Sequence, residues 1–186
     1  MCFSAEPAAD GDVGAHASRP ARLVGLDEAL QNWFDGAAHA SRAPDDARAG
    51  FTLSLTTIDE AGWPRTALLG LAEVFAPDSG HLVLALWQAS RSNRCLRAQG
   101  RALLSFVFEN RFHQWRLVMR RSETHVDAGE DPGLVCHLMA LEGGEAHSVP
   151  YATLTSGIRY ALVDEAATST RWRVQTQRMR RFAKGA

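Results

Sequence analysis

Residues 81–94 of the chain are HLVLALWQASRSNR, a stretch in which one kind of pattern gives way to another. Leucine recurs at every second position, which predicts a strand that ends at Trp87 and buries one face. Ser90 is a favoured helix N-cap and Gly100 a favoured C-terminal stop, so a short helix should span 90–98. The stretch therefore predicts a strand that passes through a tight turn into a helix.

Alternating patterns continue on both sides of this stretch. Turn residues, among them Gly62, Gly80 and Asn110, separate runs in which apolar and polar residues alternate. Ahead of these runs, apolar residues at helical spacing predict a helix over 26–39. The further strands are predicted over residues 51–56, 63–75, 101–108 and 112–121.

The same kinds of pattern predict a helix and two strands in the last third of the chain. Asp131-Pro132 favours a helix start, so a helix is predicted through Leu141 and ended by the glycines at 143–144. A strand is predicted over 153–163 and another through 172–174. Six or seven short strands joined by tight turns favour antiparallel pairing, in a barrel or sandwich with helices at its margin.

Length, charge and cysteine content limit the class of protein. The 186 residues suffice for one domain with a full core, expected over 21–175, with a loose arm at 1–20 and a basic, solvated tail at 176–186. A net charge of −1 excludes a basic field over the whole surface, so nucleic acid is not expected as a partner. No apolar run approaches the roughly 20 residues that cross a bilayer. Three widely spaced cysteines and no secretory leader predict a cytoplasmic protein without a metal site.

The helix start within residues 86–94 is the strongest candidate for a binding site. Backbone N–H groups at a helix N-terminus are unpaired and carry partial positive charge, which favours an anion such as phosphate. Arg65, at the start of a predicted strand, can reach the same group. The alternative is an ordinary capped surface helix with solvated arginines. The polar side chains at this helix start are Ser90, Arg91, Ser92 and Arg94.

The order of these patterns resembles the pyridoxamine 5′-phosphate oxidase family, which belongs to the FMN-binding split barrels. The resemblance rests on RTALL at 65–69, a hairpin, the strand at 82–87, SRS at 90–92 and GRALL at 100–104. It covers roughly residues 50–125 and extends more weakly to 150–174. It implies a Greek-key-like, antiparallel split β-barrel with flanking short helices, in a homodimer that holds FMN at its interface.

The resemblance also implies which residues would hold the cofactor. Two arginines and two serines would bind the FMN phosphate, and three residues of one strand would lie beside the isoalloxazine. Two more would follow the ribityl chain or the ring, and one of two neighbours would approach from the other subunit. The phosphate residues are Arg65, Arg91, Ser90 and Ser92, and the residues beside the isoalloxazine are Thr66, Ala67 and Leu68. The residues along the ribityl chain or the ring are Trp87 and Gln88, and the residue from the other subunit is Gln114 or Trp115.

Two positions depart from the family pattern. Gly70 and Ser92 stand where lysines are expected, and Arg94 can replace one of these charges. The C-terminal signature of the oxidases themselves is absent, so the resemblance does not extend to pyridoxamine 5′-phosphate as the substrate. It implies an FMN-dependent oxidoreductase acting on an unidentified small molecule, with no catalytic side chain assigned. The alternatives are a non-catalytic flavin carrier or sensor, and a relative that has lost flavin binding or uses deazaflavin or haem in the same cleft.

Overall fold

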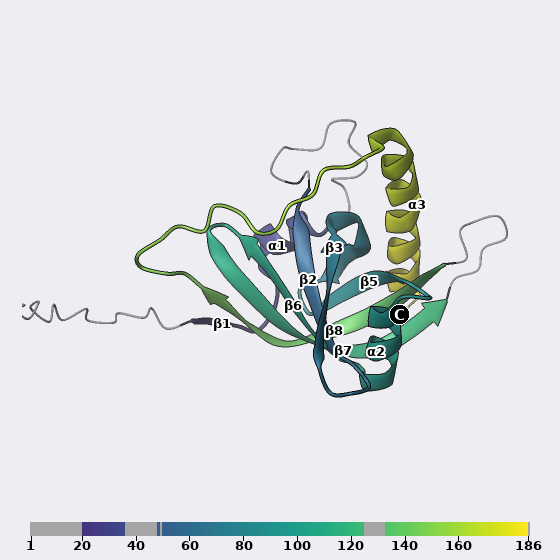
Figure 1. Cartoon of the computed structure of the whole chain (residues 1–186), viewed down its shortest axis with the longest axis horizontal. Coiled ribbons are helices and arrows are strands. Elements are labelled where there is room, and N and C mark those ends of the chain that lie inside the picture. The colour runs from purple at the N-terminus through teal and green to yellow at the C-terminus, as the bar shows by residue number, and fades with distance from the viewer. Residues whose placement is uncertain (1–19, 36–47, 49, 125–132, 186) are drawn as a thin grey trace, which may run out of the picture.

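The computed structural model describes residues 20–35, 48, 50–124 and 133–185, so the predicted arm lies, except for residue 20, outside the described residues. One antiparallel sheet dominates, with the strand order β3-β2-β6-β7-β8-β5-β4, and β1 pairs with β8. The sheet curls into a half-barrel (Figure 1). The predicted mainly β, antiparallel split barrel with helices at its margin is confirmed.

The described residues form eight strands, of which β7 and β8 are the longest with 14 residues each. Leucines and aromatic residues from the inward faces of these strands fill one core, in which Leu53, Leu104 and Trp115 are fully buried. The strands are β1 (Ala21–Leu23), β2 (Thr52–Ile58), β3 (Pro64–Gly70), β4 (Val74–Asp78), β5 (His81–Trp87), β6 (Arg101–Phe108), β7 (Arg111–Thr124) and β8 (Leu134–His147).

The strand and helix predicted from residues 81–94 are confirmed as β5 and α2 (Arg91–Gln99). The hydroxyl of Ser90 accepts a hydrogen bond from the backbone N–H of Asn93, and Gly100 ends the helix in a left-handed conformation with φ 66°. A residue with a Cβ would be strained there, which is why glycine stops this helix.

The helix predicted over 26–39 forms only in part. α1 (Glu28–Trp33) is capped by the Asp27 carboxylate, which accepts from the backbone N–H of Leu30 at 2.8 Å. The described helix ends at Trp33, and residues 36–39 lie outside the described residues.

The helix predicted through Leu141 is wrong, because residues 134–147 form strand β8 between β7 and β5. The glycines at 143–144, interpreted as a helix stop, belong to this strand. Gly143 lies at a register shift against β7, and a Cβ on Gly144 would come within 2.6 Å of the Trp115 ring. These glycines therefore fit a bulge and a large core side chain.

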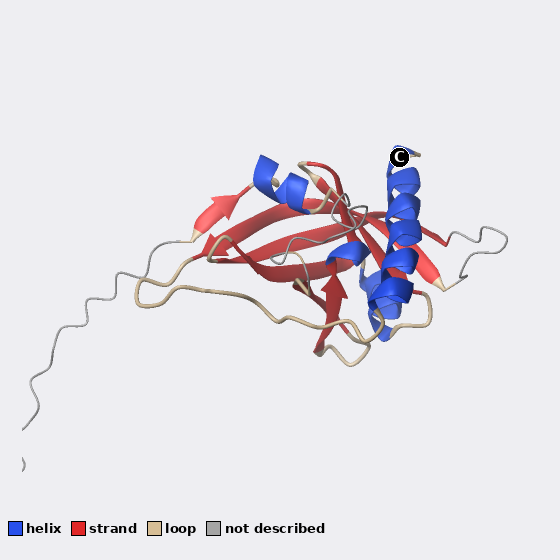
Figure 2. Cartoon of the chain, turned by 90° about the horizontal axis from the view of Figure 1, so that it is seen from above, coloured by secondary structure: helices blue, strands red, loops and turns tan. Residues whose placement is uncertain are grey.

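The strand predicted through 172–174 is wrong, because helix α3 (Glu165–Lys184) spans these residues. Residues 176–184 of the predicted solvated tail belong to the same helix. Met179 and Phe182 of α3 pack on Val83 and Cys136 of the sheet. α3 stands beside one end of the sheet (Figures 1 and 2). Because α3 covers this face, β5 and β8 are buried on both faces there, so the single buried face predicted for β5 from its alternating leucines is wrong.

Two further strand predictions need correction. Residues 153–163 form an irregular segment in place of a strand, with an isolated bridge between Phe51 and Arg159. The strand predicted over 63–75 breaks into β3 and β4 at a 3₁₀ turn, η2 (Leu71–Glu73). Within the described ranges, no helix is long and apolar enough to span a membrane.

Candidate functional site

Three arginines from two elements line one pocket at the start of α2. Arg65 comes from β3, and Arg91 and Arg94 come from the first turn of α2. The pocket has a volume of about 240 Å³. Arg94 also donates to the backbone carbonyl of Ala89 at 3.1 Å, which holds its side chain near the helix start. We name this the arginine pocket; it brings together the guanidinium groups predicted to bind phosphate.

The arginine pocket also contains carboxylates from the β2–β3 turn. Asp59 and Glu60 line it together with the arginines. One Asp59 oxygen accepts from the backbone N–H groups of Ala61 and Trp63, at 3.0 and 2.9 Å. Its charge is therefore partly used within the turn, whereas exposed Glu60 contributes an acidic group at the pocket.

The two serines predicted as hydroxyl partners are not among the residues that line the arginine pocket. The Ser90 oxygen caps α2 through Asn93, and Ser92 lies on the inward side of the helix with only 9 % of its surface exposed. The serines of this motif thus shape the helix start, and the arginines provide the charge.

The residues predicted beside the isoalloxazine lie on β3, which is an edge strand of the sheet. Thr66 shares a hydrogen bond of 3.0 Å with Thr56 of β2. Leu68 is 53 % exposed, and Trp87, at the end of β5, is 40 % exposed. Leu68 and Trp87 line a second pocket of about 200 Å³, which places these two predicted residues together.

This second pocket contains polar groups that sequence reasoning missed. Glu73 accepts a hydrogen bond from the Gly70 N–H at 2.7 Å, and burial raises the pKa of its carboxyl. Burial and the neighbouring Glu73 carboxylate raise the pKa of Tyr160 to about 12, so its phenol stays protonated and able to donate. Arg171 of α3 lies over the Trp87 ring at 5.9 Å. These groups meet only because α3 and the segment before it fold back onto β3, and neither was predicted.

Of the two residues predicted to reach a second subunit, only one offers surface to it. Trp115 is fully buried in the core. Gln114, its neighbour on β7, points to the opposite face and is partly exposed. Gln88, predicted beside the ribityl chain, is exposed, and its carbonyl accepts from Asn93 at 2.7 Å.

A buried histidine holds the first turn of α2 against the sheet. His137 of β8 is fully buried, and its Nε2 lies 2.9 Å from the side-chain oxygen of Asn93. The amide oxygen can only accept, so Nε2–H donates. Burial lowers the pKa of His137 to about 4, so the imidazole is neutral near pH 7. Asn93 thereby connects the Gln88 carbonyl to β8 and fixes the helix start that carries Arg91 and Arg94.

Within the described residues, no group of three or more His, Cys, Asp or Glu side chains is arranged to hold a metal ion. The donor set of the arginine pocket is cationic and suits an anion. In the second pocket, exposed Leu68 and Trp87 suit an apolar ring. The residues present therefore fit a phosphorylated cofactor with a planar ring.

Comparison with known proteins gives distant matches. No protein-family model matches the chain. The uncharacterized protein YclD of Bacillus subtilis is 24 % identical over 128 residues, which are 68 % of this chain and 81 % of that protein. Three solved structures are similar to this chain, with the TM-scores, identities and coverages that follow. A pyridoxamine 5′-phosphate oxidase-like protein of Lactobacillus delbrueckii has a TM-score of 0.48 at 14 % identity, over 64 % of this chain and 93 % of that one. An FMN-binding protein of Syntrophomonas wolfei has 0.44 at 10 %, over 66 % and 91 %, and an F420 reductase has 0.44 at 11 %, over 55 % and 98 %.

These three proteins are among the solved structures similar to this chain. At these identities and TM-scores they say nothing about what this chain binds.

Proposed function

We propose that the chain binds FMN as a homodimer and acts as a flavin-dependent oxidoreductase on a small molecule. The observation that carries the proposal is the convergence of Arg65, Arg91 and Arg94 on one pocket. Exposed Leu68, from the same strand as Arg65, and Trp87 line a second pocket. A pocket with three guanidinium groups at a helix N-terminus suits a phosphate monoester, which is the charged end of FMN.

Arg94 supplies the charge that the family pattern places at residue 92. It lies two residues further along α2 and lines the same pocket as Arg65 and Arg91. A hydrogen bond to a charged group is typically worth roughly 1.5–3 kcal/mol, so a third guanidinium compensates for much of the missing lysine.

Side chains of the second pocket would orient the ring. Leu68 and Trp87 provide apolar surface, and β3 is an edge strand with backbone groups not paired to another strand. A bound flavin would supply two-electron redox chemistry, and the chain would hold the phosphate, set the ring orientation and limit access of water.

A continuous face of the sheet supports a homodimer. The cross-strand register aligns Leu68, Ser54, Ser105 and Gln114 across β3, β2, β6 and β7, and all four are at least partly exposed. A second copy on this face would cover the β3 edge and bring its own Gln114 toward the flavin. The homodimer is thus the arrangement in which Gln114 can contact the cofactor.

The dimer is tested by placing an arginine at the centre of this face. Ser105→Arg is expected to convert a dimer to a monomer in sedimentation velocity, because its long charged side chain would be buried without a partner. Gln99→Arg, on the exposed side of α2, is the control and should sediment as the wild type does. A wild-type protein that is monomeric and still binds FMN would contradict the dimer.

Removal of the Glu60 carboxylate is expected to change the affinity for FMN in the opposite direction from removal of an arginine. Glu60→Gln removes the exposed carboxylate from the arginine pocket, so FMN should bind about two- to fivefold more tightly at low salt. Isothermal titration at two salt concentrations measures this, and the gain should shrink at the higher concentration because the interaction is screened. A lower affinity in Glu60→Gln would mean that the phosphate does not sit in this pocket.

The function itself is tested with the purified protein. Its visible spectrum and its titration with FMN report flavin binding, and rapid bleaching of the flavin absorbance by a reductant or an amine substrate reports turnover. Binding without substrate-dependent bleaching would favour a flavin carrier or sensor. A colourless protein that takes up no added FMN would refute both.

A further inference from the structure

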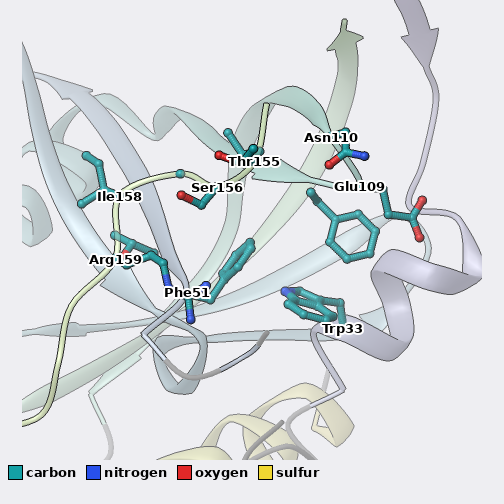
Figure 3. Close-up of a pocket in the computed structure, with 12 residues that line it drawn as sticks. Trp33, Phe51, Glu109, Asn110, Thr155, Ser156, Ile158 and Arg159 are labelled. Carbon is teal, nitrogen blue, oxygen red and sulfur yellow. The ribbon is translucent and has the colours of Figure 1, made fainter. Parts of the chain in front are cut away.

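A further pocket lies away from the predicted cofactor residues. It has a volume of about 480 Å³, within the range of small-molecule sites, and none of the twelve predicted cofactor residues lines it. Figure 3 shows Trp33 and Phe51 on one side and the segment through Thr155, Ser156 and Ile158 on the other. We name it the aromatic pocket.

Three aromatic rings form one wall of the aromatic pocket. The Trp33 ring lies 5.3 Å from Phe51 in an edge contact and 5.0 Å from Phe108 in a tilted one. The Arg48 guanidinium lies 4.8 Å from the Trp33 ring centre and interacts with the π system of the indole. Aromatic walls of this kind favour a planar aromatic ligand, which can make further stacked or edge contacts with the rings.

One polar atom of this wall has no partner. The indole nitrogen of Trp33 is buried, and no acceptor in the described part of the chain lies within hydrogen-bond distance of it. A buried N–H without an acceptor is costly, and most such groups in folded proteins are paired. Trp33 lines the pocket, and an acceptor atom of a ligand can pair this nitrogen once the indole ring shifts enough to expose it.

The opposite wall is polar and lightly anchored. Residues 153–159 have no regular secondary structure. An isolated bridge between Phe51 and Arg159 and the hydrogen bond from the Tyr160 N–H to the Gly50 carbonyl, at 3.2 Å, link this segment to the sheet region. Ser156 offers a hydroxyl, and Ile158 is 56 % exposed. This wall can adjust to a ligand without disturbing the sheet.

The charged side chains that line the aromatic pocket are one of each sign, Glu109 and Arg159. Arg48 lies against the Trp33 ring and is not among the lining residues. In the arginine pocket, by contrast, three guanidinium groups outnumber the two carboxylates of Asp59 and Glu60. An uncharged ligand is therefore expected.

We propose that the aromatic pocket is a second ligand site, which binds an uncharged, planar bicyclic aromatic molecule with its ring against Phe51 and Phe108. A carbonyl oxygen or ring nitrogen of that molecule accepts the hydrogen bond from the Trp33 indole. The site stands independently of the flavin proposal, since it shares no residue with the arginine pocket.

Coumarin is a suitable probe because it is planar, bicyclic and neutral and has a carbonyl acceptor. Its titration into ¹⁵N-labelled protein is followed on the five tryptophan indole N–H resonances, with Trp33 assigned from its loss in Trp33→Phe. The Trp33 resonance is expected to move downfield and saturate, with a Kd of about 1 mM for a ligand of this size. The exposed Trp63 should not move.

Two variants and one competitor make the test specific. Trp33→Phe keeps an aromatic ring but loses the donor, and should weaken coumarin binding about five- to tenfold. Ile158→Ala, at an exposed position with little effect on folding, should weaken it a few-fold, whereas Trp63→Phe is the matched control with no change. Saturating FMN should leave the Trp33 resonance in place.

Three results would overturn the proposal. They are no movement of the Trp33 resonance with coumarin, equal coumarin affinity in Trp33→Phe and Trp63→Phe, and displacement of coumarin by FMN. Displacement would assign the aromatic pocket to the flavin. Failure of FMN to bind anywhere would leave the coumarin result intact, so the two proposals fail separately.

Discussion

Arg65→Ala and Arg91→Ala are each expected to weaken FMN binding at least about tenfold, and the double variant about a hundredfold or more. Each substitution removes one guanidinium from the arginine pocket and leaves the phosphate with fewer charged donors. Isothermal titration of FMN into the wild type and the three variants measures the loss.

Two controls separate phosphate binding from a general effect. Arg97→Ala removes an exposed arginine from the last turn of the same helix, outside the pocket, and should leave the affinity for FMN unchanged. Riboflavin lacks the phosphate, so Arg65→Ala should not affect whatever affinity it has. Unchanged FMN affinity in both single variants would contradict the arginine pocket as the phosphate site, and an equal loss for riboflavin would indicate damage to the ring side.

The parts of the fold predicted well are those in which local pattern and tertiary environment agree. β2 and β6 have one face in the core and alternate accordingly, and α2 has a cap and a stop that act within its own turns. The motif around Ser90 brought Arg91 and Arg94 to one place because a helix start fixes their spacing. Arg65 joined them through the resemblance.

The errors over residues 134–147 and 172–184 have one common cause, which is that α3 was not predicted. Residues 134–141 are nearly all apolar, and such a run does not distinguish a helix from a strand buried on both faces. It is a strand because β5 and β7 flank it and α3 covers its other face. The register shift at Gly143 likewise depends on a partner strand and has no signature in the local sequence.

In the candidate site, too, the features set by local motifs could be predicted, and those set by contacts between distant segments could not. The arginine pocket depends on two short motifs, so it could be predicted. The pocket with Glu73, Tyr160 and Arg171 depends on contacts between segments about 90 residues apart, for which neither spacing nor composition gave any indication. The choice between Gln114 and Trp115 required the register of β7, because one residue of shift exchanges the buried and exposed faces.

The neutral His137 should make the protein less stable in acid. Its pKa is about 4 in the folded state against 6.5 unperturbed, because burial disfavours the charged form. Between these pH values the unfolded chain binds a proton that the folded chain does not, so the free energy of unfolding falls as the pH decreases from about 6.5 to 4. A shift of this size corresponds to a loss of roughly 3 kcal/mol, complete below the folded pKa and absent above 6.5.

His137→Gln isolates this contribution, since glutamine keeps a donor toward Asn93 but does not titrate. Urea unfolding at pH 7.5 and pH 4.5 should give a smaller loss of stability in the variant than in the wild type, and the difference between the two losses belongs to His137. Identical losses would mean that His137 does not stay neutral in the fold. Because Asn93 lies in the first turn of α2, a variant that disturbs this contact should also weaken FMN binding at pH 7.5, where the histidine is uncharged in both states. A loss of affinity at that pH would therefore report the position of the helix start, separately from the proton.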